Sequence, residues 1–119
     1  MRLTGAELGE STLADVLLAD CRLDLAGLRF ATLERVVFRD CRMSECDLYG
    51  ATLKDVLFER CELRGARFSA VTVERVELAG CDLAGADGVE ALRGARMPLG
   101  DAIANAPTLA TALGLELVD

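Results

Sequence analysis

The sequence repeats a large apolar residue every five positions, and this period limits the fold more than any other feature. Starting at Leu3 and stepping by five, seventeen consecutive positions up to Leu83 hold Leu, Phe, Met or Val. The residue two positions earlier is small or medium-sized from Ala6 to Cys81, and all five cysteines belong to this second series. Such a period matches neither the 3.6-residue repeat of an α-helix nor the two-residue alternation of a strand. The chain is therefore expected to turn a corner every five residues.

A second period, of twenty residues, indicates that four such segments close one square coil. It appears as three columns of identical residues, namely Cys21, Cys41, Cys61 and Cys81, then Val16, Val36, Val56 and Val76, and finally Thr12, Thr32, Thr52 and Thr72. Residues two apart on an extended chain point to the same side. We therefore expect the large and small apolar series to point inward and the Thr column to lie on the outer surface.

These repeats resemble those of the pentapeptide-repeat family, whose unit is a small residue, a polar residue, Leu or Phe, and two variable residues. The resemblance covers residues 1–87 and implies an all-β fold, a right-handed quadrilateral β-helix of about four coils. The sequence departs from the family pattern where Val and Cys replace Ala, and where Gly88 stands in place of the next large residue. Residues 1–87 are accordingly assigned to the β-helix and residues 88–119 to an irregular final turn and a cap of the same domain.

The last thirty residues predict a helical cap over the final coil. After Gly88 the register slips by one, and Pro98 then suits a helix start. Pro107 disfavours helical geometry at the residue before it, so two short helices or one kinked helix are expected near residues 99–113. One helical face is predicted from the spacing of Leu99, Ala102, Ile103, Ala106, Ala110 and Leu113. A polar-faced cap is the usual way to cover a solenoid end, and residues 115–118 are expected to add a final strand.

At the N-terminal end the first five-residue repeat starts at Met1, and no cap is expected there. Leu3, Leu8, Leu13 and Leu18 would form an apolar layer with an open strand edge. Self-association, a protein partner, or further upstream residues would each cover this layer. We expect a homodimer through this end, and dimerisation through the C-terminal helices is the rival arrangement.

No catalytic, cofactor-binding or metal-binding site is predicted. The chain has no His, which removes the usual general base and metal ligand. The Cys column would run straight at about 4.8 Å per coil, whereas zinc needs four converging ligands, so we expect free thiols that fill the core. Stacked carboxylates, Asp20 over Asp40 and Glu62 over Asp82, would lie on a convex outer wall and not in a cleft. The protein is therefore not expected to be an enzyme.

Charge and hydropathy argue against a nucleic-acid-binding protein and against an exported or membrane-spanning one. The net charge is −7, and this acidic balance argues against a basic patch that would neutralise phosphates, so direct binding of nucleic acid is not expected. The first ten residues do not read as a signal peptide, and no apolar run is long enough to span a membrane. A location in the bacterial cytoplasm is therefore expected.

The family resemblance implies DNA mimicry as one function. Its best-understood members are acidic rods that resemble duplex DNA, occupy the DNA site of DNA gyrase, a type II topoisomerase, and are linked with fluoroquinolone resistance. Here the outer columns alternate in sign, as in Asp15, Arg35, Asp55 and Arg75. Residues 1–88 hold 16 acidic and 11 basic residues, a net charge of −5. Duplex DNA would carry about 11 charges over the ~19 Å that four coil steps span. DNA mimicry therefore stays the alternative hypothesis.

Apolar residues at outer positions favour a non-catalytic protein-interaction scaffold. Leu17, Val37 and Leu57 repeat at twenty residues, at a position that is usually polar, and Leu25 and Phe30 occupy corner positions. Apolar residues that gather on a surface are typical of protein-binding sites. We therefore predict that these five residues form an interaction ridge for a protein partner or a second copy.

Overall fold

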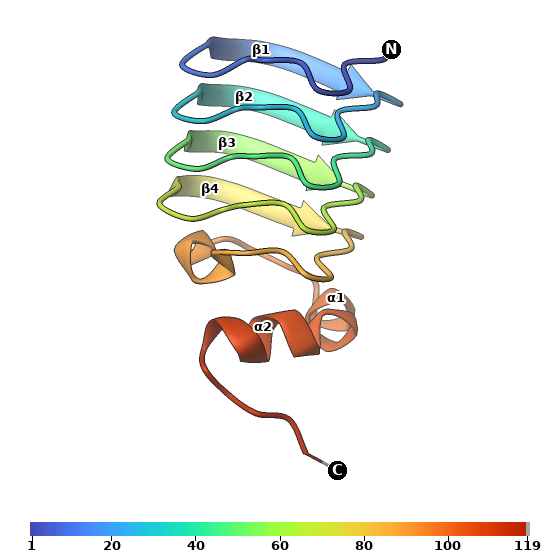
Figure 1. Ribbon diagram of the computed structural model, residues 1–119, viewed down its shortest axis with the longest axis vertical. Coiled ribbons are helices and arrows are strands. Elements are labelled where there is room, and N and C mark those ends of the chain that lie inside the picture. The colour runs from blue at the N-terminus through green and yellow to red at the C-terminus, as the bar shows by residue number, and fades with distance from the viewer. Residues whose placement is uncertain (119) are drawn as a thin grey trace.

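Four parallel strands stack into one sheet along the long axis of the molecule (Figure 1). They are β1 (Thr12–Ala19), β2 (Thr32–Arg39), β3 (Thr52–Glu59) and β4 (Thr72–Ala79). Each strand pairs with the next at an offset of twenty residues, as in Thr12 with Thr32 and Val16 with Val36. The computed structural model describes residues 1–118, which form a right-handed coil of 42 × 24 × 22 Å. The predicted β-helix is thereby confirmed.

A left-handed residue at every fifth position makes the corners. All seventeen residues at five-residue intervals from Gly5 to Gly85 have a φ between 51° and 71°, and twelve of them are not glycine. Two corners of each coil also close a backbone turn, as where the Ala26 N–H donates to the Leu23 carbonyl at 3.0 Å. The five-residue period of the sequence is therefore the corner-to-corner distance of the coil.

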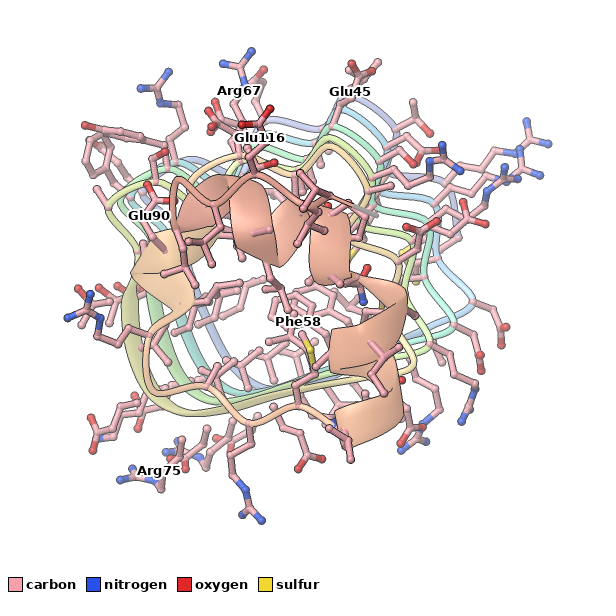
Figure 2. All side chains as sticks on the ribbon, turned by 90° about the horizontal axis from the view of Figure 1, so that it is seen from below. Glu45, Phe58, Arg67, Arg75, Glu90 and Glu116 are labelled. Carbon is pink, nitrogen blue, oxygen red and sulfur yellow. The ribbon has the colours of Figure 1, made fainter. Side chains whose placement is uncertain are left out.

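The two apolar series fill the interior as predicted. From Cys21 to Leu83 nearly all their members are buried. Phe38 and Phe58 stack with ring centroids 5.0 Å apart, and Phe68 meets Phe58 edge to face at 6.5 Å (Figure 2 labels Phe58 in the centre of the coil). In the first coil the corresponding residues are only half-buried, since no coil lies above them in residues 1–118.

The regular sheet is shorter than the four coils expected from the sequence. Three twenty-residue steps separate β1 from β4, so the sheet has about three turns. The final turn contains the short helix η1 (Val89–Leu92) and pairs Arg96 with Glu77, nineteen residues earlier. The offset of nineteen in place of twenty is the predicted slip of one residue. It follows Gly88, which has a φ of 70° and directly precedes η1.

Two short helices cover the last coil, as the sequence predicts. They are α1 (Leu99–Ala104) and α2 (Ala106–Ala112), with Asn105 between them and Pro107 in the first turn of α2. The predicted face is wrong, however, already within α1, whose two large residues point away from the coil while Asp101 and Asn105 bind it. Leu99, Ile103 and Leu113 point to solvent, whereas Ala110 is buried. The expected final strand at residues 115–118 does not form, and this segment runs past α2 without strand pairing.

Candidate interaction surfaces

The outer face of the sheet brings three residues of the predicted ridge into one line. Leu17 pairs with Val37 and Val37 with Leu57 across neighbouring strands, and Glu77 follows in the same column. Leu17 is 57% exposed, while Val37 and Leu57 are half-buried by their neighbours. We call Leu17, Val37 and Leu57 the wall stripe.

Ion pairs border the wall stripe on both sides. At the corner before it, Arg35 binds both carboxylate oxygens of Asp15, and Arg75 does the same with Asp55. Hydrogen bonds from Arg35 hold the pKa of Asp15 below its usual value, and Arg75 acts in the same way on Asp55. On the other side, Arg39 donates to Glu59 at 2.8 Å. The stripe is therefore an apolar centre with a charged but internally neutralised border.

The other two residues of the predicted ridge lie elsewhere. Leu25 and Phe30 occupy the two corners of the opposite wall, the wall on which Arg67 lies in Figure 2, whereas the wall stripe lies on the wall that begins at the Arg75 corner. The Phe30 ring lies over Gly50, where a Cβ atom would come within 2.5 Å of it. The structure therefore does not join Leu25 and Phe30 to the wall stripe.

Phe30 is part of an aromatic cluster that the sequence analysis missed. Its ring meets the Tyr49 ring edge to face at 5.6 Å, and the Arg29 guanidinium lies 4.8 Å from the centre of the Tyr49 ring. Arg29 also lies 3.6 Å from a carboxylate oxygen of Asp47. The sequence could have indicated this contact, because Tyr49 lies nineteen residues after Phe30 and one coil contains twenty. The cluster stays open to solvent, with Phe30 53% and Tyr49 37% exposed.

The Cys column is buried and consists of free thiols. Each thiol from Cys41 onward donates to a backbone carbonyl of the coil before it, as Cys41 Sγ does to Leu18 O at 3.2 Å and Cys61 Sγ to Phe38 O at 3.2 Å. Burial raises the pKa of Cys41 to about 11 and that of Cys46, which lies outside the column, to about 12. Cys41 and Cys46 are therefore protonated at neutral pH, and the hydrogen bonds of the column satisfy carbonyl groups of the preceding coil. Within residues 1–118, no three His, Cys, Asp or Glu side chains gather as a metal ion would need.

The stacked carboxylates lie on the outer walls next to arginines. Arg60 binds both oxygens of Asp40 at 2.8 and 3.2 Å. Glu62 has Arg42 at 3.6 Å, and Asp82 has Arg64 at 3.7 Å. These side chains are substantially exposed and bound to cations, which suits a solvated wall and not acid–base chemistry. The Thr column likewise lies in register on the outer face of the sheet.

Side chains of the cap complete the exposed edge of the last coil. Asn105, which is buried, accepts a hydrogen bond from the Leu83 N–H at 2.9 Å and donates to the Cys81 carbonyl at 3.1 Å. Thr108 donates to the Leu83 carbonyl at 3.0 Å, and Asp101 accepts from the Gly80 N–H. These side chains replace the backbone groups that another coil would supply. The sequence analysis does not predict these contacts, because a polar residue within an apolar helical pattern is normally assigned to the solvent-exposed face.

The outer side of the cap is apolar, against the expectation of a polar face. Six large apolar residues are exposed there, namely Leu99, Ile103, Leu113, Leu115, Leu117 and Val118. Two grooves of about 640 and 500 Å³ lie where the last coil meets α2. None of the helices in residues 1–118 is long and apolar enough to cross a membrane.

Comparison with known proteins agrees with this architecture. A family model described as the pentapeptide repeat region matches residues 1–68. A pentapeptide repeat protein from the thylakoid lumen of Arabidopsis thaliana is 21% identical, with a TM-score of 0.53, and the match covers 87% of this chain and 77% of that one. A second such protein, from the cyanobacterium Nostoc, is 24% identical with a TM-score of 0.50, over 82% and 84% of the two chains.

A third structure, HetL of Nostoc, is a pentapeptide repeat protein involved in the regulation of heterocyst differentiation. It is 20% identical with a TM-score of 0.50, and the match covers 80% of this chain but only 48% of HetL. No curated protein matches the sequence. At these identities the solved structures establish the fold alone.

Proposed function

We propose that this chain, which belongs to the pentapeptide-repeat family, is a non-catalytic scaffold that binds a protein partner through the wall stripe. The observation that carries the proposal is the line of Leu17, Val37 and Leu57 between two rows of ion pairs. Protein interfaces commonly have an apolar centre and a polar border. A flat sheet face with this arrangement suits a partner that presents a complementary apolar surface.

Interaction is also the role that the remaining chemistry favours. The carboxylates discussed above are exposed and bound to arginine, and the column thiols are buried in the core. Neither group is placed to attack or to protonate a substrate. We infer a reducing compartment such as the bacterial cytoplasm, because all five cysteines are free thiols.

The same ion pairs argue against mimicry of DNA. A mimic needs rows of unpaired negative charge, whereas here neighbouring coils pair opposite charges, as in Asp15 with Arg35 and Asp40 with Arg60. Such pairs cancel much of the field that a DNA-binding site would attract. The residues themselves therefore favour the protein-binding scaffold over a gyrase-directed mimic.

Site-specific cross-linking in cells that naturally make the protein tests the proposal. A photoreactive amino acid replaces Val37, in the centre of the wall stripe, or Arg67, an exposed residue of the opposite wall. We expect a discrete cross-linked partner from position 37 and none from position 67. Because burial of a Leu is worth about 1.5–3 kcal/mol, Leu57→Glu should reduce this product at least tenfold. Equal products from both positions, or no effect of Leu57→Glu, would contradict the proposal.

A further inference from the structure

Two large apolar side chains stand at adjacent corners of one coil, on the wall opposite the wall stripe. Leu25 has a φ of 62° and is 58% exposed, and Phe30 has a φ of 59° and is 53% exposed. All other corner residues from Gly5 to Gly85 are glycine, alanine or charged. The left-handed conformation is costly for a bulky residue, and residues that are costly to the fold are typical of functional positions. We call Leu25 and Phe30 the corner pair.

The outer position between these two corners carries no side chain. Gly27 pairs with Glu7 in the coil before it and with Asp47 in the coil after it, and the column continues with Arg67 and Asp87. The charges of this column alternate in sign except at Gly27, where the pattern requires a cation. The column at the corner before the wall stripe completes the same alternation with arginines. The chain therefore leaves out one cation of a regular charge pattern.

The carboxylate that this cation would bind lies directly over Gly27. A Cβ atom on Gly27 would come within 2.8 Å of Glu7 Oε2. No cation in residues 1–118 forms an ion pair with Glu7, whereas Asp47 has an arginine at 3.6 Å. Glu10 and Glu45 stand at corners one coil before and one coil after the corner pair, and both are exposed (Figure 2 labels Glu45). The surface between the two apolar corners is therefore negative.

We propose that a protein partner crosses this wall with a short segment whose lysine or arginine side chain lies over Gly27 and binds Glu7, while apolar side chains on either side of it contact the corner pair. The partner thus supplies the cation that completes the alternating column. Carboxylates around an apolar contact select a basic segment by charge complementarity. The segment runs from corner to corner and does not reach Arg67, which lies two coils along the column. The corner pair is separate from the wall stripe, so either proposal can fail without the other.

Selection from a library of random peptides displayed on phage, with the full chain as the target, tests this proposal. We expect the enriched peptides to share a lysine or arginine next to a large apolar residue. Fluorescence anisotropy with a synthetic copy of the most enriched peptide then gives a dissociation constant. Absence of enrichment, or enriched peptides without a cation, would overturn the proposal.

Three charge variants locate the bound cation. Gly27→Lys supplies the cation from the chain itself and should weaken binding of the selected peptide at least tenfold. Ala84→Lys is the matched control, because it adds the same charge at an exposed position of the last coil, and it should leave the dissociation constant within about twofold. Glu7→Gln should weaken binding about two- to fivefold, as expected for an exposed ion pair. Equal binding by Gly27→Lys and Ala84→Lys would show that the peptide responds only to the overall acidity of the chain, and the proposal would be wrong.

Leu25→Gly tests the apolar contact without loss of the fold. Glycine adopts the corner conformation readily, so this variant should unfold at the same urea concentration as the wild type or at a higher one. It should nevertheless bind the peptide at least tenfold more weakly, as expected for the loss of a buried leucine at the contact. Leu57→Glu, in the wall stripe, should leave peptide binding unchanged. Wild-type binding by Leu25→Gly, or loss of binding in Leu57→Glu, would place the peptide elsewhere and overturn the proposal.

Discussion

At the residue scale, the corners depend on a backbone conformation that most side chains avoid. The left-handed region costs a residue with a side chain about 1–2 kcal/mol, yet twelve of the seventeen corner residues are not glycine, Leu25, Phe30 and Arg35 among them. The strain is tolerated because the coils above and below hold each corner. Glycine would relieve it at corners where the side chain has no other role.

The same substitution should therefore have opposite effects at two positions. Ala70 is an exposed corner residue with a φ of 61°, so glycine there relieves the strain of the left-handed conformation. Glycine also makes the unfolded chain more flexible, which offsets part of the gain. We expect Ala70→Gly to stabilise the fold by about 0.5–1 kcal/mol in total. Ala84 is exposed but lies outside the corner series, so Ala84→Gly should destabilise by about 0.5–1 kcal/mol. Urea unfolding gives both values. Destabilisation by both variants would show that the corners are not strained.

The buried thiols give a second prediction at this scale. Burial and a pKa of about 11 for Cys41 leave almost no accessible thiolate near pH 8, and Cys61 is equally buried, with a pKa raised by its hydrogen bond to Cys81 and by burial. Labelling of Cys41 and Cys61 by a thiol reagent should be slow in the native protein and fast in denaturant. Thr52→Cys, on the outer face of the sheet, should react at once. Rapid native labelling of Cys41 and Cys61 would refute their role as core residues.

At the element scale, the cap seals the coil with side chains in place of a strand. Asn105 supplies one acceptor and one donor to the edge of the last coil, in the same way that a further coil would. Unpaired backbone groups at such an edge would be costly to bury and prone to pair with another chain. The cap therefore protects this edge while its own outer side stays apolar.

Asn105→Leu, a change of similar volume, tests this function of the cap. It would leave the Leu83 N–H and the Cys81 carbonyl without these partners, and each buried unpaired group costs about 1–3 kcal/mol. We expect a loss of about 2–4 kcal/mol in urea unfolding. Thr111→Ala, which removes only a hydroxyl bonded within α2, should cost less than about 0.5 kcal/mol. Equal midpoints for the two variants would show that the edge does not depend on Asn105.

In the helical cap, the sequence predicts where the helices lie but not which face of each helix packs inward. Pro98 and Pro107 predict two short helices or one kinked helix, and the two helices observed lie near the predicted positions because proline acts locally. Which face packs inward depends on the hydrogen bonds that Asp101 and Asn105 make with the last coil, and the spacing of apolar residues contains no information on those bonds. Leu25 and Phe30 are a different case, because the five- and twenty-residue periods already place them at the two corners of the wall opposite Leu17.

At the scale of the whole molecule, a strict repeat makes most of the surface predictable. The twenty-residue period places Asp15 beside Arg35 and Asp55 beside Arg75, and both ion pairs form. The contacts that the sequence does not predict lie where the repeat ends, in the final turn and the cap. The regular coils are predictable because each residue has an equivalent in the next coil, twenty residues along the chain. The final turn and the cap have no such equivalents.

Charge pairing between coils is also what separates a protein-binding scaffold from a mimic of DNA. Arg35, Arg39, Arg60 and Arg75 each neutralise a carboxylate of a neighbouring coil. The rod therefore lacks the continuous negative walls that a DNA-binding channel would select. The account predicts that DNA gyrase does not recognise this molecule.

A gyrase supercoiling assay with added protein tests this central claim most directly. We expect no inhibition of supercoiling, and no protection from a fluoroquinolone, at protein concentrations equal to and tenfold above that of the enzyme. Inhibition or protection at stoichiometric levels, lost when the outer-wall carboxylates Glu45, which is exposed, and Glu77, which is half-buried, are changed to Gln, would contradict the account and establish the molecule as a mimic of DNA.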